Sequence, residues 1–255
     1  NDRVVTLPTL MRDGGYRTYM TGKWHLGSGE GKGPAYRGVE RSFSLNSGGA
    51  SHYADMRPSY APSPEIKADY AEDGVKLKAL PADFEYSTQY YVDQMIKYLA
   101  DHGDSKDPFF AFLSFTAPHW PLHAWEDDIV KYEGNYMAGY DAIRTSRHEQ
   151  QKGLGVVDDK WEISPRDSDS PDWDDVQNKE YEDIRMATYC AMIEQVDRTV
   201  GRIVDSVKKA GEFENTVIMF LSDNGGCAEL FQEDSDWPDP SQWASSTTLD
   251  GEPVR

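Results

Sequence analysis

Two short, almost continuously apolar runs constrain the fold of this chain more than any other feature. One covers residues 109–115 and follows Pro108, and the other covers 216–221 and follows a long amphipathic stretch. Apolar runs of this length, bounded by turn residues, are typical of strands buried on both faces in a parallel sheet. A helix that leads into such a strand indicates an α/β domain. We therefore expect both runs to be parallel neighbours or near-neighbours in one sheet flanked by helices.

The composition limits the classes of protein and partner. The 255 residues, of which 38% are hydrophobic, suit one large α/β domain or part of one. The net charge of −19 argues against nucleic acid and anionic membrane surfaces as partners, and no apolar run predicts a membrane span. The two cysteines, Cys190 and Cys227, do not make a disulfide framework. Because the chain begins without Met and ends without a terminal element, we expect an interior segment of a longer protein. Its oligomeric state stays open.

Three stretches outside residues 122–178 carry helical signals. Thr6 suits the N-cap of a short helix over 7–14. Apolar residues at helical spacing over 92–99 predict a second helix, which Asp83 is expected to cap. The clearest helix covers 180–210, where an apolar stripe runs along one side.

Lys23 and His25 are the first candidates for chemistry. They lie in a Gly-Lys-Trp-His-Leu-Gly sequence, directly after an aromatic and β-branched run over 16–21 that predicts a strand. Because alternate side chains of a strand share a face, we expect Lys23 and His25 to point the same way and Trp24 the other. An ammonium group beside an imidazole can bind a tetrahedral oxyanion. The alternative is a surface strand with ordinary polar residues.

Two further histidines lie on predicted loops. His119 sits between Pro118 and Pro121, beyond the carboxyl end of the 109–115 run. Open α/β sheets bind their ligands at such ends, although a structural histidine in a proline-rich turn is an equal alternative. His52 ends a glycine-rich turn, which we expect to be a loop with an ordinary surface histidine, the alternative being a turn that lines a pocket.

Asp223 and Asn224 are the candidate metal ligands. They follow the second apolar run and precede Gly225. A carboxylate and an amide oxygen are hard ligands, which suit Ca²⁺ or Mg²⁺ and not Zn²⁺. The common alternative for a bare Asp-Asn-Gly sequence is a turn.

Taken together, these stretches resemble the sulfatase family of the alkaline-phosphatase-like superfamily. Residues 15–27 are similar to the second sulfatase signature, and the Pro-His-x-Pro sequence around His119 and the Ser-Asp-Asn-Gly sequence at 222–225 follow in the family's order. The resemblance implies an α/β, alkaline-phosphatase-like sandwich whose mostly parallel central sheet is flanked by helices. Residues 1–255 are then the central part of one catalytic domain, truncated at both ends. A periplasmic or secreted location is also implied.

The resemblance further implies the hydrolysis of a small-molecule or carbohydrate sulfate ester. A formylglycine, made from the first residue of a Cys/Ser-x-Pro-x-Arg motif, is implied as the nucleophile. A divalent ion, usually Ca²⁺ and less often Mg²⁺, is implied at Asp223 and Asn224. Lys23 and His25 would hold sulfate oxygens, and His119 would hydrogen-bond or protonate the leaving oxygen. The division of roles between the two histidines stays open.

The chain also departs from the family pattern. Cys190, Cys227 and every serine fail to fit the nucleophile motif, and no lysine follows Asp223, where the family has a second sulfate-site lysine. We expect the nucleophile and two more metal-binding aspartates upstream of Asn1, and the segment alone to be inactive. A phosphatase or phosphodiesterase of the same superfamily is one alternative, although the chain lacks paired histidines for two zinc ions. A sulfatase-like protein that binds an anion without turning it over is the other.

Residues 122–178 are expected to form an insertion or loop region near the mouth of the site. An irregular helix is expected over 125–153, followed by an acidic loop over 156–175. Long insertions near a site often set substrate choice, but these residues do not reveal which ester is bound.

Overall fold

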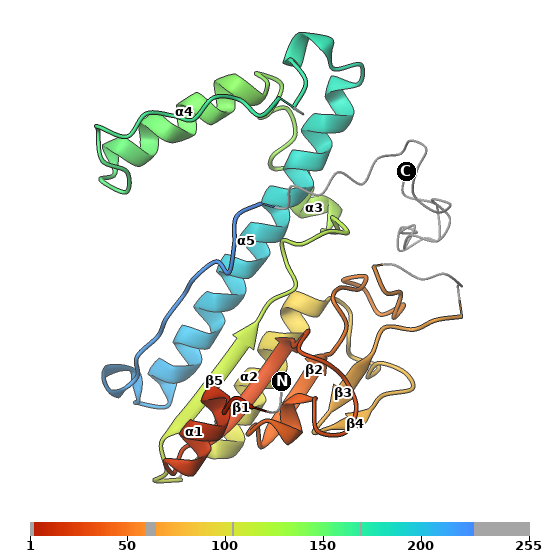
Figure 1. Ribbon diagram of the computed structural model, residues 1–255, viewed down its shortest axis with the longest axis vertical. Helices are drawn as coiled ribbons and strands as arrows, with labels where there is room; N and C mark the ends of the chain where they lie inside the picture. The colour runs from red at the N-terminus through yellow and green to blue at the C-terminus, as the bar shows by residue number, and fades with distance from the viewer. Residues whose placement is uncertain (1–2, 60–64, 104, 169, 227–255) are drawn as a thin grey trace. The chain divides into compact units, whose positions relative to one another are not determined.

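The computed structural model describes residues 3–59, 65–103, 105–168 and 170–226 (Figure 1). The chain divides into two compact units. The first, here called the sheet unit, comprises residues 1–123 and 195 onward, and the second, the helical unit, comprises residues 124–194. No helix of the described ranges combines the length and apolar character needed to cross a membrane.

The sheet unit contains a mixed five-stranded sheet. Its strands lie in the order β4-β3-β2-β1-β5, with bounds Arg17–Lys23 (β1), Arg41–Leu45 (β2), Tyr70–Glu72 (β3), Val75–Lys76 (β4) and Phe109–Ser114 (β5). Strand β1 pairs in parallel with both β2 and β5, whereas β2–β3 and β3–β4 are antiparallel. The parallel part brings the carboxyl ends of β1, β2 and β5 to one edge of the sheet.

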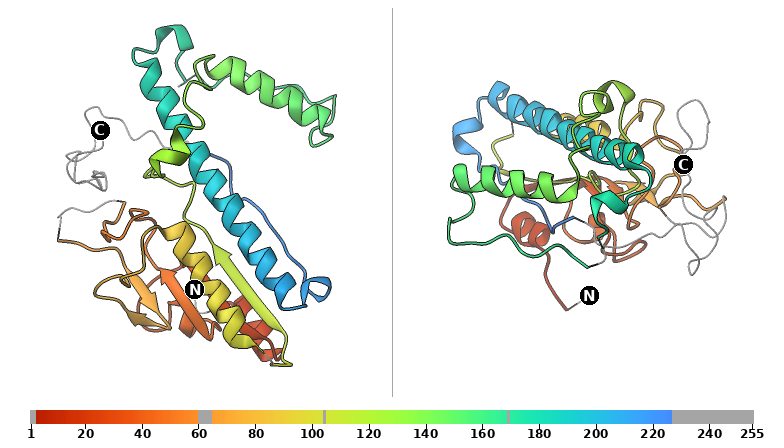
Figure 2. Two further views of the ribbon diagram at one scale, coloured as in Figure 1. Left: turned by 180° about the vertical axis from the view of Figure 1, so that it is seen from behind. Right: turned by 90° about the horizontal axis from the view of Figure 1, so that it is seen from above.

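Helices cover both faces of this sheet, which confirms the α/β class. Helix α1 (Leu7–Asp13) contacts β1 on one face, and α2 (Ser87–His102) covers the other (Figures 1 and 2). Thr6 is the N-cap of α1, as predicted, and its side chain accepts a hydrogen bond from the Thr9 amide at 3.4 Å. The prediction that Asp83 caps α2 is wrong, because the N-cap is Tyr86. Single-turn 3₁₀ helices occur at Pro34–Tyr36 and Phe213–Asn215.

Strand β1 is the buried centre of the sheet. Its side chains alternate between two cores: Tyr19 packs with Met95 and Tyr98 of α2, and Met20 packs with Trp24 on the opposite face. Burial on both faces follows because the strand has a neighbour on each side and a helix above and below. The threonines and the arginine of β1 gave no sign of this central position in the sequence.

An aromatic cluster joins β2 and β3 to α2. Phe43 of β2 lies 4.8 Å from Tyr90, between ring centroids, in an edge-on arrangement. Tyr70, Phe84 and Tyr91 complete the cluster, and Tyr70 and Tyr91 share a buried hydroxyl contact of 3.5 Å. Edge-on and tilted rings are the favourable packing of aromatic groups, so this cluster anchors the start of α2 on the sheet.

The two apolar runs differ from expectation. The first forms β5, but β5 is the edge strand of the described sheet, and Phe112 keeps 44% of its surface exposed. The second prediction is wrong: residues 216–221 form no strand, and Val217 is 81% exposed. An apolar run becomes a buried strand only when another strand pairs with it and other layers cover it. Within the described ranges, no strand pairs with residues 216–221.

The helical unit holds α3 (Glu126–Ile129), α4 (Tyr140–Gly153), the 3₁₀ turn Trp173–Asp175 and the first part of α5 (Lys179–Lys209). The single irregular helix expected over 125–153 is thus two helices. The buried carboxylate of Asp183 accepts hydrogen bonds from the amides of Gly134 at 2.6 Å and Tyr136 at 2.7 Å. It therefore holds the turn between α3 and α4 onto α5. The α5 bounds confirm the predicted long helix.

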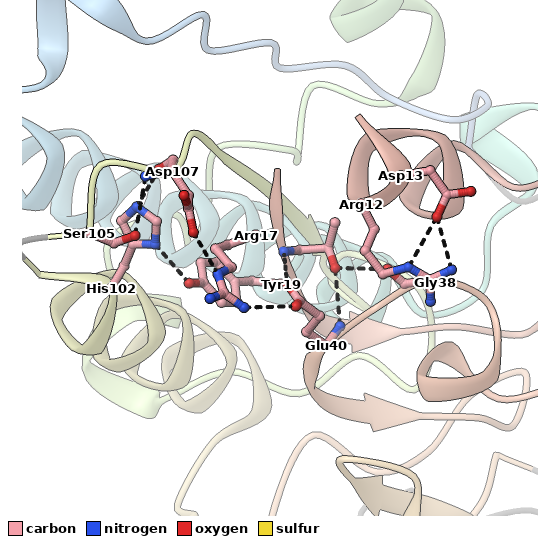
Figure 3. A network of polar contacts seen from close by, with 10 residues as sticks. Arg12, Asp13, Arg17, Tyr19, Gly38, Glu40, His102, Ser105 and Asp107 are labelled. Carbon is pink, nitrogen blue, oxygen red and sulfur yellow. Dashed lines mark hydrogen bonds and ion pairs between the residues drawn. The ribbon is translucent and has the colours of Figure 1, made fainter. Parts of the chain in front are cut away.

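A charged network closes the amino-terminal edge of the sheet (Figure 3). Arg17 donates from Nη1 to Glu40 at 3.1 Å and from Nε to Asp107 at 3.1 Å. His102 contacts the Asp107 carbonyl through Nε2 at 2.9 Å and the Tyr19 hydroxyl through Nδ1 at 2.9 Å. Because a carbonyl only accepts, Nε2 of His102 carries the proton and Nδ1 accepts from Tyr19. Every cation of this network has a partner.

Candidate functional site

The opposite, carboxyl-terminal edge of the sheet carries the candidate site. Lys23 is the last residue of β1, the turn after β2 begins at Asn46, and the loop after β5 contains His119. Because β1, β2 and β5 are mutually parallel, these three connections start at the same edge. The sheet topology therefore gathers segments that are far apart in the sequence.

The backbone turns sharply between Lys23 and His25. Strand β1 ends at Lys23, and His25 has a φ of 49°, in the left-handed region that non-glycine residues rarely adopt. The strand-face argument for Lys23 and His25 is therefore wrong. Trp24 is buried, and its indole donates to the Lys32 carbonyl at 2.9 Å. That anchor holds the turn while leaving His25 exposed.

Gly48 and Gly49 form a turn that lies against both histidines. A Cβ on Gly48 would come within 2.8 Å of His25 Nε2. A Cβ on Gly49 would lie 2.3 Å from Ser59 Oγ and 4.0 Å from His119 Cε1. Only a residue without a side chain allows His25 such a close approach to the turn. The turn thus brings the β1 and β5 connections together.

His25 lies close enough to Lys23 and His119 for their charges to influence it. Partial desolvation, followed by repulsion from Lys23 and His119, lowers the pKa of His25. Burial lowers the pKa of Lys23, and the attraction of Asp223 opposes that change. The side chains of Lys23 and His25 have no hydrogen bond or ion pair with any other residue that the structure describes. Of the five predicted site residues, Lys23, His119 and Asp223 are thus close enough to influence the ionisation of His25 or Lys23.

The His119 ring is held at one nitrogen. Its Nδ1 lies 2.7 Å from the Trp120 carbonyl. Since a carbonyl accepts only, Nδ1 carries a proton, and Nε2 is the nitrogen left for another partner. A neutral ring in this tautomer offers a lone pair at Nε2, and a protonated ring offers a donor there.

His52 is a residue that sequence reasoning misplaced. It is 1% exposed, not a surface histidine, and it contacts Ser87 and the carbonyl of His119. Its ring stacks with Tyr86, with centroids 5.7 Å apart. The partners come from α2 and from the loop after β5, so no local signal in the sequence pointed to this burial.

Asp223 and Asn224 lie on an exposed turn. Asn224 donates from Nδ2 to the Gly225 carbonyl at 2.7 Å and accepts at its own carbonyl from Ser222 Oγ at 2.5 Å. This leaves the Asp223 carboxylate and the Asn224 side-chain oxygen as donors of the type that a hard cation binds. Among residues placed by the structure, no cluster of three or more acidic, histidine or cysteine side chains forms a metal site. Cys227 lies outside the described residues.

Comparisons with known proteins agree in one family. The Sulfatase family model matches residues 1–242. The chain is 38% identical over 233 residues to an uncharacterised sulfatase of Schizosaccharomyces pombe, covering 88% of this chain and 41% of that protein. It is 35% identical over 226 residues to an arylsulfatase of Klebsiella aerogenes, covering 88% and 48%. The crystal structure of Ps i-CgsB shares the fold with a TM-score of 0.54 and 21% identity, covering 82% of this chain and 37% of that one. The chain thus spans less than half the length of each.

Proposed function

We propose, from the premise that this chain belongs to the sulfatase family, that it supplies the sulfate-binding side of an active site for sulfate-ester hydrolysis. The convergence of Lys23, His25 and His119 at one sheet edge carries this proposal. Each can donate hydrogen bonds to a sulfate oxygen. The whole chain carries a net charge of −19. The attraction for sulfate must therefore come from these three side chains and not from the overall charge.

Lys23 and His25 are assigned to the sulfate group. Neither side chain has a hydrogen-bond or ion-pair partner among the residues in the described ranges, so an incoming oxyanion does not have to displace one. Partial desolvation of Lys23 strengthens its attraction for an anion. Donors that are already in place stabilise the charge that develops in the transition state.

His119 is assigned to the leaving oxygen. Its Nδ1 is occupied by the Trp120 carbonyl, so the ring presents Nε2 alone to a ligand. A histidine with one nitrogen held and the other available can act as a general acid once protonated. His25 has no such fixed nitrogen and lies beside Lys23, which favours sulfate binding for His25.

Asp223 and Asn224 are assigned as two of the ligands of a divalent cation, with Ca²⁺ preferred over Mg²⁺. When bound, this ion would polarise a sulfate oxygen. Two side-chain ligands hold Ca²⁺ weakly by themselves, because affinity grows with ligand number and charge. No residue of this chain fits the formylglycine motif, so the nucleophile is assigned to another part of the protein.

The substrate class is a small-molecule or carbohydrate sulfate ester. The similarity to an arylsulfatase supports a test with an aryl ester first. A full-length protein containing this chain should release nitrophenol from p-nitrophenyl sulfate and lose activity when Ca²⁺ is chelated. The 255-residue chain by itself should show no turnover.

Two controls separate the alternatives. Faster hydrolysis of p-nitrophenyl phosphate than of the sulfate would favour a phosphatase. Binding of inorganic sulfate without turnover by the full-length protein would favour a binding protein. Robust turnover by the chain alone would show that its nucleophile lies within it and would contradict the assignment.

A further inference from the structure

His52 bridges the start of α2 and the loop that carries His119. Its own carbonyl accepts from the Ser87 amide at 2.7 Å, and its Nδ1 lies 2.9 Å from Ser87 Oγ. Its Nε2 lies 3.2 Å from the His119 carbonyl. One buried ring therefore ties a helix terminus to the backbone of a candidate catalytic residue.

The hydrogen bonds define the state of the His52 ring. The His119 carbonyl can only accept, so Nε2 of His52 carries the proton, and Nδ1 accepts from the Ser87 hydroxyl. A neutral His52 ring therefore makes both hydrogen bonds, one as the donor to the His119 carbonyl and one as the acceptor from Ser87, and each ring nitrogen has a partner. Burial, together with the charges of His123 and His119, lowers the pKa of His52 to about 3 despite the opposing effect of the His119 carbonyl. The ring is thus neutral over the physiological pH range.

Tyr86 and the backbone of His52 also hold His123, at the other end of the loop that contains His119. The Tyr86 hydroxyl donates to the His123 carbonyl at 2.7 Å, and the His52 amide donates to His123 Nδ1 at 3.3 Å. His123 is 5% exposed and stacks with Tyr53, with ring centroids 5.1 Å apart. Residues 119–123 are therefore held at both ends by groups from outside the loop.

The orientation of the His119 ring depends on this backbone. Its Nδ1 bonds the Trp120 carbonyl, in the peptide that directly follows the carbonyl held by His52. A rotation of either peptide would move the acceptor and release the ring. We propose that His52 is a positioning residue that fixes the His119 loop so that Nε2 of His119 faces the ligand.

This inference rests on the proposed role of His119 at the leaving oxygen. His52 does not touch substrate in this arrangement, because it is 1% exposed and all its polar atoms are used. Its effect should therefore depend on the need for protonation of the leaving group. Loss of His52 should harm esters with poor leaving groups far more than nitrophenyl esters.

Substitutions at His52 can separate hydrogen bonding from packing. His52→Phe keeps a ring beside Tyr86 but removes both hydrogen bonds. His52→Gln has an amide donor that can reach the His119 carbonyl, whereas the amide of His52→Asn is one methylene shorter and can reach only Ser87. His102→Phe is the matched control, because His102 also joins a hydroxyl to a carbonyl, but at the opposite edge of the sheet.

The experiment uses the full-length protein with an alkyl sulfate and p-nitrophenyl sulfate. His52→Phe and His52→Asn should lower kcat for the alkyl ester by about 10- to 100-fold, with a much smaller loss for the nitrophenyl ester. KM should change little, His52→Gln should recover most of the loss, and His102→Phe should leave the ratio of the two esters unchanged. Equal losses for both esters in a folded His52→Phe variant would overturn the inference.

A second readout does not require turnover. Histidine ¹⁵N spectra of the full-length protein should show Nδ1-protonated His119 in the parent and in His52→Gln, and a mixture of tautomers in His52→Phe. If the parent hydrolyses no sulfate, the proposed function fails while this comparison still decides the positioning role. An unchanged His119 tautomer in folded His52→Phe would overturn that role. Where His52→Phe does not fold, Ser87→Ala removes only the hydrogen bond between Ser87 Oγ and His52 Nδ1. It should change the kinetics and the His119 tautomer in the same direction as His52→Phe, but less.

Discussion

The amino-terminal and carboxyl-terminal edges of the sheet each carry a basic residue and a histidine, Arg17 and His102 at the first and Lys23 and His25 at the second. Of these four side chains, only the first two have hydrogen-bond or ion-pair partners within the described ranges. At the amino edge, Arg17 binds two carboxylates and His102 has both nitrogens occupied (Figure 3). At the carboxyl edge, the side chains of Lys23 and His25 have no hydrogen-bond or ion-pair partner among the residues in the described ranges, and His25 adopts a left-handed conformation. Paired charges on a surface contribute little beyond local order, whereas unpaired and partly desolvated charges keep their attraction for a ligand. The contrast supports the proposed site at the carboxyl edge.

Removal of one cation from the carboxyl edge should have the largest effect. Lys23→Ala in the full-length protein should lower kcat for p-nitrophenyl sulfate by about 100-fold or more, because a preorganised donor to the developing charge is lost. The thermal midpoint should hardly change, since Lys23 makes no polar contact within the described ranges. Lys97→Ala, at an exposed position of α2, is the control. Equal activity of Lys23→Ala and parent would remove Lys23 from the site.

Gly22→Ala tests the close pairing of β1 with β5 next to the carboxyl-terminal edge of the sheet. Gly22 has a φ of 108°, and a Cβ there would lie 1.9 Å from the Ser114 carbonyl oxygen of β5. We expect a loss of about 2 kcal/mol or more in the free energy of unfolding, measured with urea, from backbone strain and the clash. Gly201→Ala in α5 is the matched control, because outside the adjacent helix backbone no atom lies within 4 Å of the position that its methyl group would take. A fully stable Gly22→Ala variant would contradict the observed strand pairing.

Acid should weaken the carboxyl edge through its buried histidines. Burial lowers the pKa of His52 to about 3 and that of His123 to about 4. The unfolded chain binds these protons below a pH of about 6.5 and the folded chain does not, so stability is lost as the pH falls from there. Each histidine should reduce the free energy of unfolding by about 1.4 kcal/mol per pH unit in this window.

Urea unfolding of the full-length protein at pH 7.5 and 5.5 measures this loss. His52→Gln should make the stability less dependent on pH, because one of the two titrating groups is removed. The groups that face His52 are His119, His123, Ser87 and Tyr86. Identical pH dependence in parent and His52→Gln would show that His52 is protonated equally in the folded and unfolded states.

Removal of the paired cation at the amino edge should have the smallest effect. The Arg17 side chain is 51% exposed, and solvent screens its two ion pairs. Arg17→Ala should shift the thermal midpoint by about 2 °C or less and leave sulfate hydrolysis unchanged. A large loss of activity in this variant would mean that the two edges are coupled, and the comparison would no longer hold.

Much of the fold followed from local patterns. The cap at Thr6 and the apolar stripe of α5 depend on neighbouring residues, so the sequence predicted them. The identities of Lys23, His25, His119 and Asp223 were also available from motifs, and the structure places the connections that carry Lys23, His25 and His119 at one edge of the sheet. Their roles in binding and catalysis stay predictions.

Tertiary structure decided which segments are covered and which groups are paired. Residues 216–221 are as apolar as a buried strand but are exposed, whereas β1 contains threonines and is fully enclosed in its centre. His52 looked like a loop residue, yet it links α2 to the His119 backbone. Burial and hydrogen bonding depend on neighbours that are distant in sequence, and a periodic pattern carries no information about which neighbours those are.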